Sequence, residues 1–185
     1  MKLIAITGNA GSGKTTVSNI LREKGYFVID ADKVVHKLLE TEEVKKFIIE
    51  NFGEAYLDRR KLSDYLFKNP DEMDKYEKFI REKVIIAINK EITGIDEDLI
   101  FIDAALVFEY GLEYLFDKII CVIADEENLI ERLKTKGYSE DTARMIHLRQ
   151  LPQKEKAKRS DIVIENNGTI EELKEKVLKL IPNFI

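Results

Sequence analysis

One short stretch near the N-terminus has the residue types and spacing needed to hold a chain of phosphates. Residues 8–15 read Gly-Asn-Ala-Gly-Ser-Gly-Lys-Thr and match the pattern G-x-x-x-x-G-K-[ST]. An apolar run at residues 3–6 precedes the pattern, and a helical pattern follows it. The glycines let successive N–H groups point inward, and a helix that begins near Lys14 adds the positive end of its dipole. We therefore predict a nucleoside triphosphate site whose contacts are Gly8, Ala10, Gly11, Ser12, Gly13, Lys14, Thr15 and Thr16.

Two side chains of this loop can act on the phosphates directly. The Lys14 ammonium can reach the β- and γ-phosphates, which makes Lys14 a candidate catalytic residue. The Thr15 hydroxyl can bind Mg²⁺. The loop predicts the donor of a phosphoryl group and says nothing about which molecule receives it.

Carboxylates follow two of the predicted strands at the point where each strand ends. Asp30-Ala31-Asp32 follows the apolar run at residues 26–29, and Asp103 follows the run at residues 99–102. In open α/β sheets, ligands bind outside the carboxyl ends of the strands. Asp103 suits a metal-binding role there, and Asp32 suits a catalytic role that orients an acceptor hydroxyl. The alternative for Asp32 is a simple N-cap of a helix that begins at Lys33 or Val34.

A basic segment lies in the last third of the chain. Residues 132–159 hold nine Lys or Arg and three Asp or Glu, whereas the whole chain has a net charge of −5. One interpretation is a helical lid that neutralises charge on the transferring phosphoryl group and excludes water. Arg132, Arg144 and Arg149 are the best candidates, because a planar guanidinium can bind phosphate through two nitrogens. The alternative is an ordinary solvated helix face.

Short apolar runs alternate with helical patterns along the chain. Near-continuous apolarity over so few residues is typical of strands buried on both faces, and the alternation predicts a three-layer α/β fold with a parallel five-stranded sheet. The predicted strands are residues 3–7, 26–29, 99–102, 118–123 and 161–164. The predicted helices are residues 14–24, 34–39, 42–51, 62–67, 71–92, 126–136, 139–149 and 170–180.

The second and third predicted strands are separated by about seventy residues, far more than one crossover connection needs. We interpret this stretch as a helical substrate-binding insertion. The expected organisation is a nucleotide-binding core at about residues 1–31, 96–131 and 160–185, an insertion at about 32–95 and a lid at about 132–159.

The bulk composition excludes several classes of protein. A net charge of −5 argues against a general binder of nucleic acid or membrane surfaces. No apolar run approaches the roughly 18 residues of a membrane-spanning helix, and no signal-peptide pattern is present. We expect a cytoplasmic protein, monomeric, with Cys121, the one cysteine, reduced in the core.

Five motifs, in order and spacing, resemble the dephospho-coenzyme A kinase family along essentially the whole chain. They are the phosphate loop; Asp30-Ala31-Asp32 with His36; the segment Asp103 to Glu109; Gln150-Leu151-Pro152 with Lys156-Ala157 and Ser160-Asp161; and Ile164-Glu165-Asn166-Asn167-Gly168.

The resemblance implies that ATP, with Mg²⁺, phosphorylates the ribose 3′-hydroxyl of dephospho-coenzyme A in the last step of coenzyme A synthesis. It implies a catalytic base at Asp32 and an adenine-side contact at Asn166, alongside the nucleotide contact expected of Arg132. The residues expected to contact the acceptor are Asp32, His36, Arg81 and Glu109. The chain departs from the family pattern at Ala105, at Arg81-Glu82, at Lys136 and at Met145.

Three other functions are compatible with a phosphate loop. Another small-molecule kinase, with a nucleoside, shikimate-like or gluconate-like acceptor, would share the loop, but the motifs at residues 30–32 and 164–168 favour the first interpretation. A GTPase would need an Asn-Lys-x-Asp guanine reader, and Asn89-Lys90 continues into Glu91-Ile92 instead. An ATP-sensing module would bind ATP without steady production of ADP.

Overall fold

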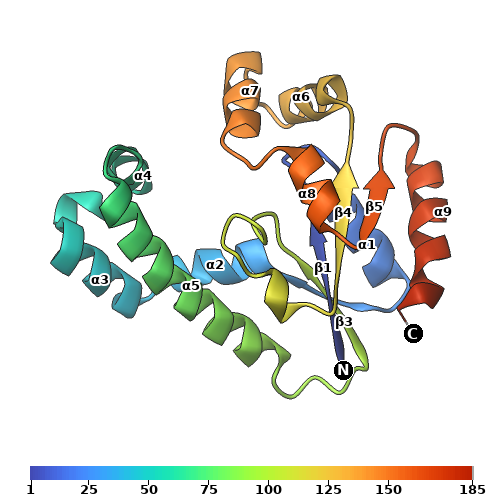
Figure 1. Cartoon of the computed structure of the whole chain (residues 1–185), viewed down its shortest axis with the longest axis horizontal. Coiled ribbons are helices and arrows are strands. Elements are labelled where there is room, and N and C mark those ends of the chain that lie inside the picture. The colour runs from blue at the N-terminus through green and yellow to red at the C-terminus, as the bar shows by residue number, and fades with distance from the viewer. Residues whose placement is uncertain (185) are drawn as a thin grey trace. The chain divides into compact units, whose positions relative to one another are not determined.

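The computed structural model describes residues 1–184, apart from the side chains of Arg59, Arg60, Ser63, Phe67 and Asn183. The chain forms two compact units, residues 1–30 with 96–185 and residues 31–95. The first unit contains the sheet, and the second is helical (Figure 1).

A parallel five-stranded sheet with the strand order β2-β3-β1-β4-β5 forms the centre of the first unit. The predicted α/β fold is therefore confirmed, and each predicted strand lies within one residue of the observed one. Ile6 on β1 pairs with Asp103 on β3, and Asp103 pairs with Asp30 on β2, so the ends of three neighbouring strands lie together. The strands are β1 (Lys2–Thr7), β2 (Phe27–Asp30), β3 (Leu99–Asp103), β4 (Lys118–Ile123) and β5 (Ile162–Glu165).

Apolar side chains on both faces of the sheet give this unit three layers. Ile4 and Ile6 point to the face covered by α1 (Lys14–Glu23) and α9 (Ile170–Leu180). Ala5, one residue out of phase, packs on the opposite face against Val107 and Phe108 of the segment that follows β3. Helix α8 (Gln153–Arg159) also packs against β4. Because both faces are covered, the strands read as continuous apolar runs.

Helices α6 (Glu126–Thr135) and α7 (Glu140–Leu148) follow β4 and share a small apolar cluster. Ala143 is fully buried there between Ile130 and Leu133. Ser139 begins α7 by accepting a hydrogen bond from the Thr142 N–H, as a helix N-cap does. Two short 3-10 helices, η2 (Glu113–Leu115) and η3 (Ile181–Asn183), complete the first unit.

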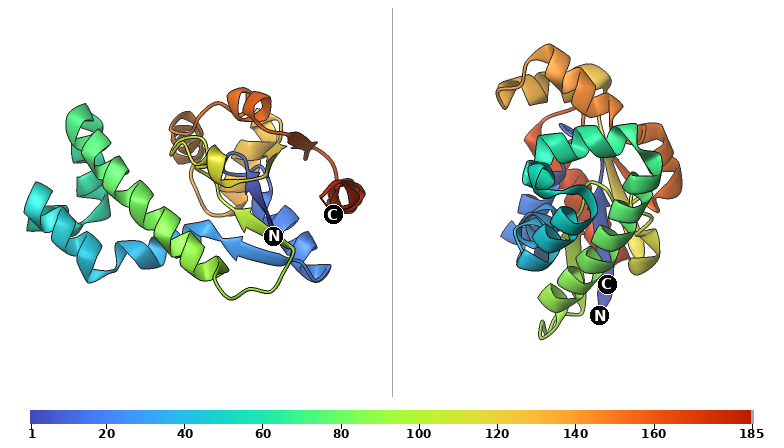
Figure 2. Two further views of the ribbon diagram at one scale, coloured as in Figure 1. Left: turned by 60° about the horizontal axis from the view of Figure 1, so that its bottom comes forward. Right: turned by 90° about the vertical axis from the view of Figure 1, so that its left-hand side faces the viewer.

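Helix packing alone builds the second unit (Figure 2). The longest helix, α5, begins with a proline at its first position and packs against α2 and α4. The Phe47 and Phe79 rings stack with centroids 3.8 Å apart and link α3 to α5. The elements are α2 (Ala31–Leu39), α3 (Glu42–Phe52), η1 (Glu54–Leu57), α4 (Arg59–Lys68) and α5 (Pro70–Ile92).

Helix α2 begins at Ala31, three residues before the predicted start at Val34. Ala31 and Val34 are both buried, and their spacing of three places them on one face of a helix. Burial of this face extends the helix back to the end of β2. Asp32 is consequently inside the first turn, and the alternative in which it caps a helix beginning at Lys33 or Val34 is wrong for this structure.

Candidate functional site

The predicted phosphate loop connects β1 to α1, and its glycines are sterically required. Gly8 has φ of 142°, and a Cβ there would lie 2.2 Å from the Val122 carbonyl oxygen. Gly13 has φ of 102°, and a Cβ there would lie 2.2 Å from Asn166 Nδ2. Both positive φ values and both close approaches exclude a side chain. These residues therefore form a tight turn at the carboxyl end of β1.

The loop has the donors that a phosphate group needs. Gly13 is the N-cap of α1 and has no side chain to accept a hydrogen bond. The first turn of α1 also has no acidic residue. Among the described residues, no side chain therefore caps the first N–H groups of this helix. The Ser12 hydroxyl and the Asn9 side-chain amide are buried, and they too have no hydrogen-bond partner within residues 1–184. Buried polar atoms and helix N-terminal N–H groups are costly to leave unpaired. The loop therefore fits an anion such as the phosphates of ATP.

The Lys14 side chain lies over this loop. Its Nζ donates to the Gly8 carbonyl at 2.9 Å and to the Asn9 carbonyl at 3.4 Å. The ammonium charge is thus held at the mouth of the turn, next to the N-terminus of α1. Thr15, which was predicted to bind Mg²⁺, is exposed.

Asp103 lies beside the loop at the end of β3 and is buried. Its Oδ2 accepts a hydrogen bond of 2.7 Å from Ser18 on α1. Burial raises the pKa of Asp103, and the Ser18 hydrogen bond and the Lys14 charge offset that increase only in part. No group of three metal-ligating side chains exists among the described residues. A Mg²⁺ ion here would therefore use phosphate and water oxygens in addition to Thr15 and Asp103.

We expect Asp103→Asn to raise thermal stability while it lowers activity. At a pH above its raised pKa, the wild-type carboxylate is charged although it is buried, and this charge destabilises the folded state. The destabilisation disappears as the pH falls toward about 4, the ordinary pKa of aspartate. The asparagine is neutral throughout and can still accept from Ser18. At pH 8 we expect a higher melting temperature than wild type, because the asparagine carries no buried charge.

The measurement is thermal unfolding of both proteins from pH 8 down to pH 4, paired with turnover at pH 8. The stability difference should shrink steadily as the pH decreases. A variant that melts several degrees below wild type at pH 8 would contradict this account of Asp103.

Arg132 and Asn166 form hydrogen bonds with the backbone of the phosphate loop. Arg132 donates to the carbonyls of Gly11 at 3.2 Å and of Asn166 at 2.8 Å. Asn166, itself buried, donates from Nδ2 to the Ser12 carbonyl at 2.7 Å. Both side chains were predicted to contact the nucleotide, and the structure places both against the backbone of the phosphate loop. They restrain the Gly11 and Ser12 carbonyls, and with them the backbone of the loop.

Glu109, which is half-buried, forms an ion pair with a buried lysine. Its Oε1 accepts from Lys156 Nζ at 2.7 Å and from the Leu151 N–H at 3.1 Å. Lys156 is fully buried and also donates to the Ala105 carbonyl at 2.8 Å. This cluster joins the segment after β3 to the start of α8. Residues 151–159, predicted as part of a lid, therefore include a helix that is anchored to the sheet.

The residues predicted to contact the acceptor, Glu109 apart, lie in the helical unit. Asp32 and His36 are exposed on α2 and are four residues apart, so they share one face of the helix. Arg81 lies on α5, and its buried Nε has no hydrogen-bond partner within residues 1–184. Asp32 thus lies at the N-terminus of α2, where its side chain is accessible to a ligand.

The two remaining candidate cations lie on and after α7. Arg144 donates to Glu140 at 2.9 Å and lies 3.6 Å from Glu126. The hydrogen bond and charge of Glu140 raise the pKa of Arg144. Arg149 is exposed at the C-terminal end of α7. Both side chains are on the surface, where little energy is needed to redirect them.

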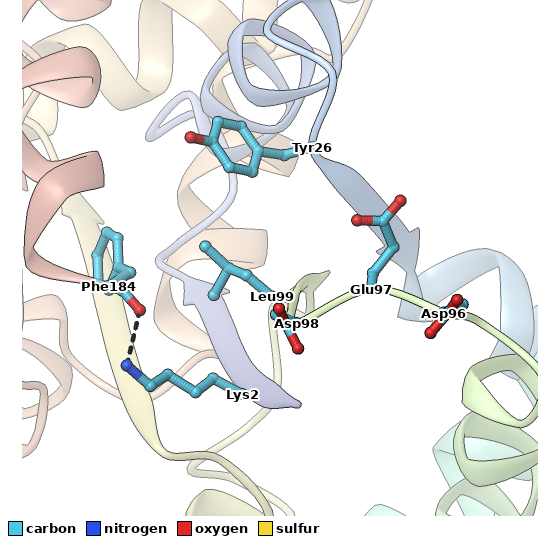
Figure 3. Close-up of a pocket in the computed structure, with 7 residues that line it drawn as sticks. All are labelled: Lys2, Tyr26, Asp96, Glu97, Asp98, Leu99 and Phe184. Carbon is cyan, nitrogen blue, oxygen red and sulfur yellow. Dashed lines mark hydrogen bonds between the residues drawn. The ribbon is translucent and has the colours of Figure 1, made fainter.

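The first unit also contains a cavity of about 550 Å³, which does not include any residue of the phosphate loop. Lys2 begins β1, Leu99 begins β3, and both line the cavity, which therefore lies at the amino ends of these strands (Figure 3). The phosphate loop follows the carboxyl end of β1. Three consecutive carboxylates, Asp96 to Asp98, line it. Their negative charge disfavours a triphosphate, so this cavity is not the nucleotide site.

A parallel sheet of this strand order, with a glycine-rich phosphate loop between β1 and α1, defines a P-loop kinase. The solved structure of TT1252 from Thermus thermophilus is 31% identical, with a TM-score of 0.86 over 100% of this chain and 98% of that one. A dephospho-CoA kinase from Campylobacter jejuni, 24% identical, has the same fold with a TM-score of 0.67 over 98% and 96% of the two chains.

The chain belongs to the dephospho-CoA kinase family. The model of that family, described as dephospho-CoA kinase, matches residues 2–172. A dephospho-CoA kinase from Aquifex aeolicus is 37% identical over 97% of this chain and 96% of its own length. The predicted family is therefore confirmed. Membership makes the chain a transferase that takes ATP as phosphoryl donor and acts on a small molecule.

Proposed function

We propose that this protein transfers the γ-phosphoryl group of Mg²⁺-ATP to the ribose 3′-hydroxyl of dephospho-coenzyme A, which produces coenzyme A and ADP. The observation that carries the proposal is the phosphate loop, with unpaired buried donors beside the Asp103 carboxylate, in a chain that matches this family almost end to end. No helix within residues 1–184 has the length and apolarity to cross a bilayer.

On the donor side, the loop N–H groups and Lys14 bind the phosphates. The ammonium stabilises negative charge on the transferring group, which is spread over three oxygens in a loose transition state. Thr15 of the loop and Asp103 at the end of β3 would hold Mg²⁺, which would neutralise negative charge on the phosphates. Adenine lies toward Asn166 and Arg132, whose side chains already fix the backbone of the loop.

On the acceptor side, Asp32 accepts a hydrogen bond from the ribose 3′-hydroxyl and aligns its oxygen with the γ-phosphorus. The proton moves to the carboxylate late in the reaction, because an alcohol is far too weak an acid for aspartate to deprotonate in advance. His36 and Arg81 add contacts to the substrate. We expect the enzyme to be monomeric, and sedimentation at micromolar concentration tests this.

We expect the double replacement of Arg144 and Arg149 by methionine to reduce kcat by about 10²-fold and to leave the Kd for ATP within about threefold. Cations that close over the phosphates act mainly when charge develops, so their removal affects the transition state more than the ground state. Turnover and ATP titration calorimetry measure the two effects separately.

A matched control removes the same charge elsewhere in the basic segment. Lys154 and Lys158 are exposed on α8, and their replacement by methionine should leave kcat within about twofold. If the arginine pair instead weakened ATP binding tenfold at an unchanged kcat, these residues would bind the ground state and the lid proposal would be wrong.

The decisive experiment incubates the pure protein with Mg²⁺-ATP and dephospho-coenzyme A and follows both products by mass spectrometry. The expected result is one added phosphoryl group, located at the ribose 3′-oxygen by fragmentation, with one ADP per product. Parallel reactions contain shikimate, gluconate or a nucleoside as the acceptor. Transfer to one of these and not to dephospho-coenzyme A would identify another kinase, and ATP binding with no ADP produced would identify a sensor.

A further inference from the structure

The edge of the phosphate loop at Ala10 is attached to a part of the chain that lies 140 residues away. The Ala10 N–H donates a hydrogen bond of 2.7 Å to Oε1 of Gln150. The Ala10 methyl group packs against the apolar cluster of α6 and α7, which includes Ile130 and Ala143. The backbone and the side chain of one loop residue are therefore both held by the segment between β4 and β5.

Gln150 itself is held in place by its neighbours. It lies between α7 and α8, and the next residue, Leu151, donates its N–H to Glu109. Glu109 is paired with the buried Lys156 at 2.7 Å. This anchoring fixes the backbone from which the Gln150 side chain reaches the loop. Only the carbonyl end of its amide can accept from an N–H, so the orientation of the amide is also defined.

Because of this hydrogen bond, the Ala10 N–H is not available to bind an anion. Ala10 was predicted to contact the nucleotide, but its N–H is directed to Gln150. The donors that remain for phosphate come from the later residues of the loop and the first turn of α1. Gln150 therefore restrains the loop at Ala10, a different residue from Gly11 and Ser12, whose carbonyls are bonded to Arg132 and Asn166.

We propose that Gln150 is a positioning residue of the nucleotide site, which holds the Ala10 edge of the phosphate loop in its binding geometry. The proposal rests on the proposed function, because the loop must bind ATP for its geometry to matter. A loop fixed in advance loses less conformational freedom when the nucleotide binds, so its affinity is higher. Loss of the bond should therefore weaken nucleotide binding more than it destabilises the fold.

The chain provides a matched control three residues away. Gln153, the only other glutamine, also bonds to backbone, with Nε2 to the Ala124 carbonyl at 2.7 Å and Oε1 to the Ala124 N–H at 3.2 Å. Methionine has the length of glutamine and lacks its acceptor. Gln153→Met loses two hydrogen bonds to Ala124, which is outside the loop, whereas Gln150→Met loses one hydrogen bond to the loop itself.

The experiment measures the Kd of Mg²⁺-ATP and Mg²⁺-ADP by calorimetry, and the melting temperature, for both variants. For Gln150→Met we expect both nucleotides to bind about 3–10-fold more weakly, the value of one hydrogen bond, with the KM for dephospho-coenzyme A unchanged. For Gln153→Met we expect the larger decrease in melting temperature and nucleotide affinities within about twofold of wild type. A purely structural role for Gln150 predicts that affinity follows stability, so that Gln153→Met is the weaker binder.

A third variant, Gln150→Glu, keeps the acceptor and adds a negative charge beside the loop. It should retain the melting temperature of wild type and weaken ATP binding, with a deficit that shrinks as salt is raised from about 0.02 to about 0.5 M because ions screen the charge. Unchanged ATP affinity in both Gln150 variants would overturn the proposal. Failure of the wild-type protein to bind ATP at all would instead overturn the proposed function.

Discussion

Replacement of Lys14 by alanine is expected to abolish phosphoryl transfer while the protein stays folded. The Lys14 ammonium lies over the Gly8 and Asn9 carbonyls, where the transferring phosphoryl group would bind. Removal of this charge takes away stabilisation at the point where negative charge develops, and we expect kcat to fall by about 10³-fold or more. The side chain is only partly buried, so its loss should cost little of the apolar packing of β1 and α1.

Coupled ADP release and thermal unfolding measure the two outcomes. Lys24→Ala is the matched control, since Lys24 is an exposed lysine at the other end of the same helix. It should turn over at the wild-type rate. A folded Lys14→Ala protein with near-normal kcat would show that the loop does not serve the transferring phosphate.

Asp32→Asn is expected to slow phosphoryl transfer by about 10²–10⁴-fold, the usual effect of a positioned general base. The asparagine has the same size and keeps one acceptor oxygen, so ATP and dephospho-coenzyme A should bind within a few-fold of their wild-type affinities. Asp32 is exposed in the first turn of α2, where a carboxylate also interacts with the helix dipole. That interaction is worth about 0.3–1 kcal/mol and affects stability only.

The same substitution in another first turn separates the two roles. Asp71 is exposed in the first turn of α5, and Asp71→Asn should lose a similar small amount of stability with no change in kcat. Pre-steady-state phosphoryl transfer, binding and melting are measured for both variants. If Asp32→Asn behaves like Asp71→Asn, Asp32 has only a dipole role, and the base must be sought at Asp30 or Asp103.

Local residue patterns determined the fold class and the position of the phosphate loop. Strands of a sheet that is covered on both faces are mostly apolar, so the strands could be located within one residue from short apolar runs alone. The glycines at positions 8 and 13 likewise indicated a tight loop, because glycine adopts their positive φ values at much lower energy than other residues do. The order of the five motifs carried the family assignment, which the whole-chain comparison confirms.

The exact start of α2 depended on burial and could not be read from its polar residues. Asp30-Ala31-Asp32 has the composition of a cap or turn, and Asp commonly precedes a helix. Burial of Ala31 and Val34 on one face extended the helix to the end of β2 and moved Asp32 inside its first turn. Tertiary packing thus outweighed the local capping preference.

Only the tertiary structure decided what surrounds the phosphate loop. Gln150 and Arg132 reach the loop across 140 and 121 residues of chain, and Lys156 pairs with Glu109 across the fold. In the sequence, these are polar residues of a basic, helical stretch that is equally typical of a solvated surface. The sequence has no periodic pattern that identifies the partner of a charged or amide side chain. The partner is whichever carbonyl or N–H group the folded chain brings within about 3 Å. The sequence therefore determined the chemistry of the loop, and the fold determined which side chains hold it in shape.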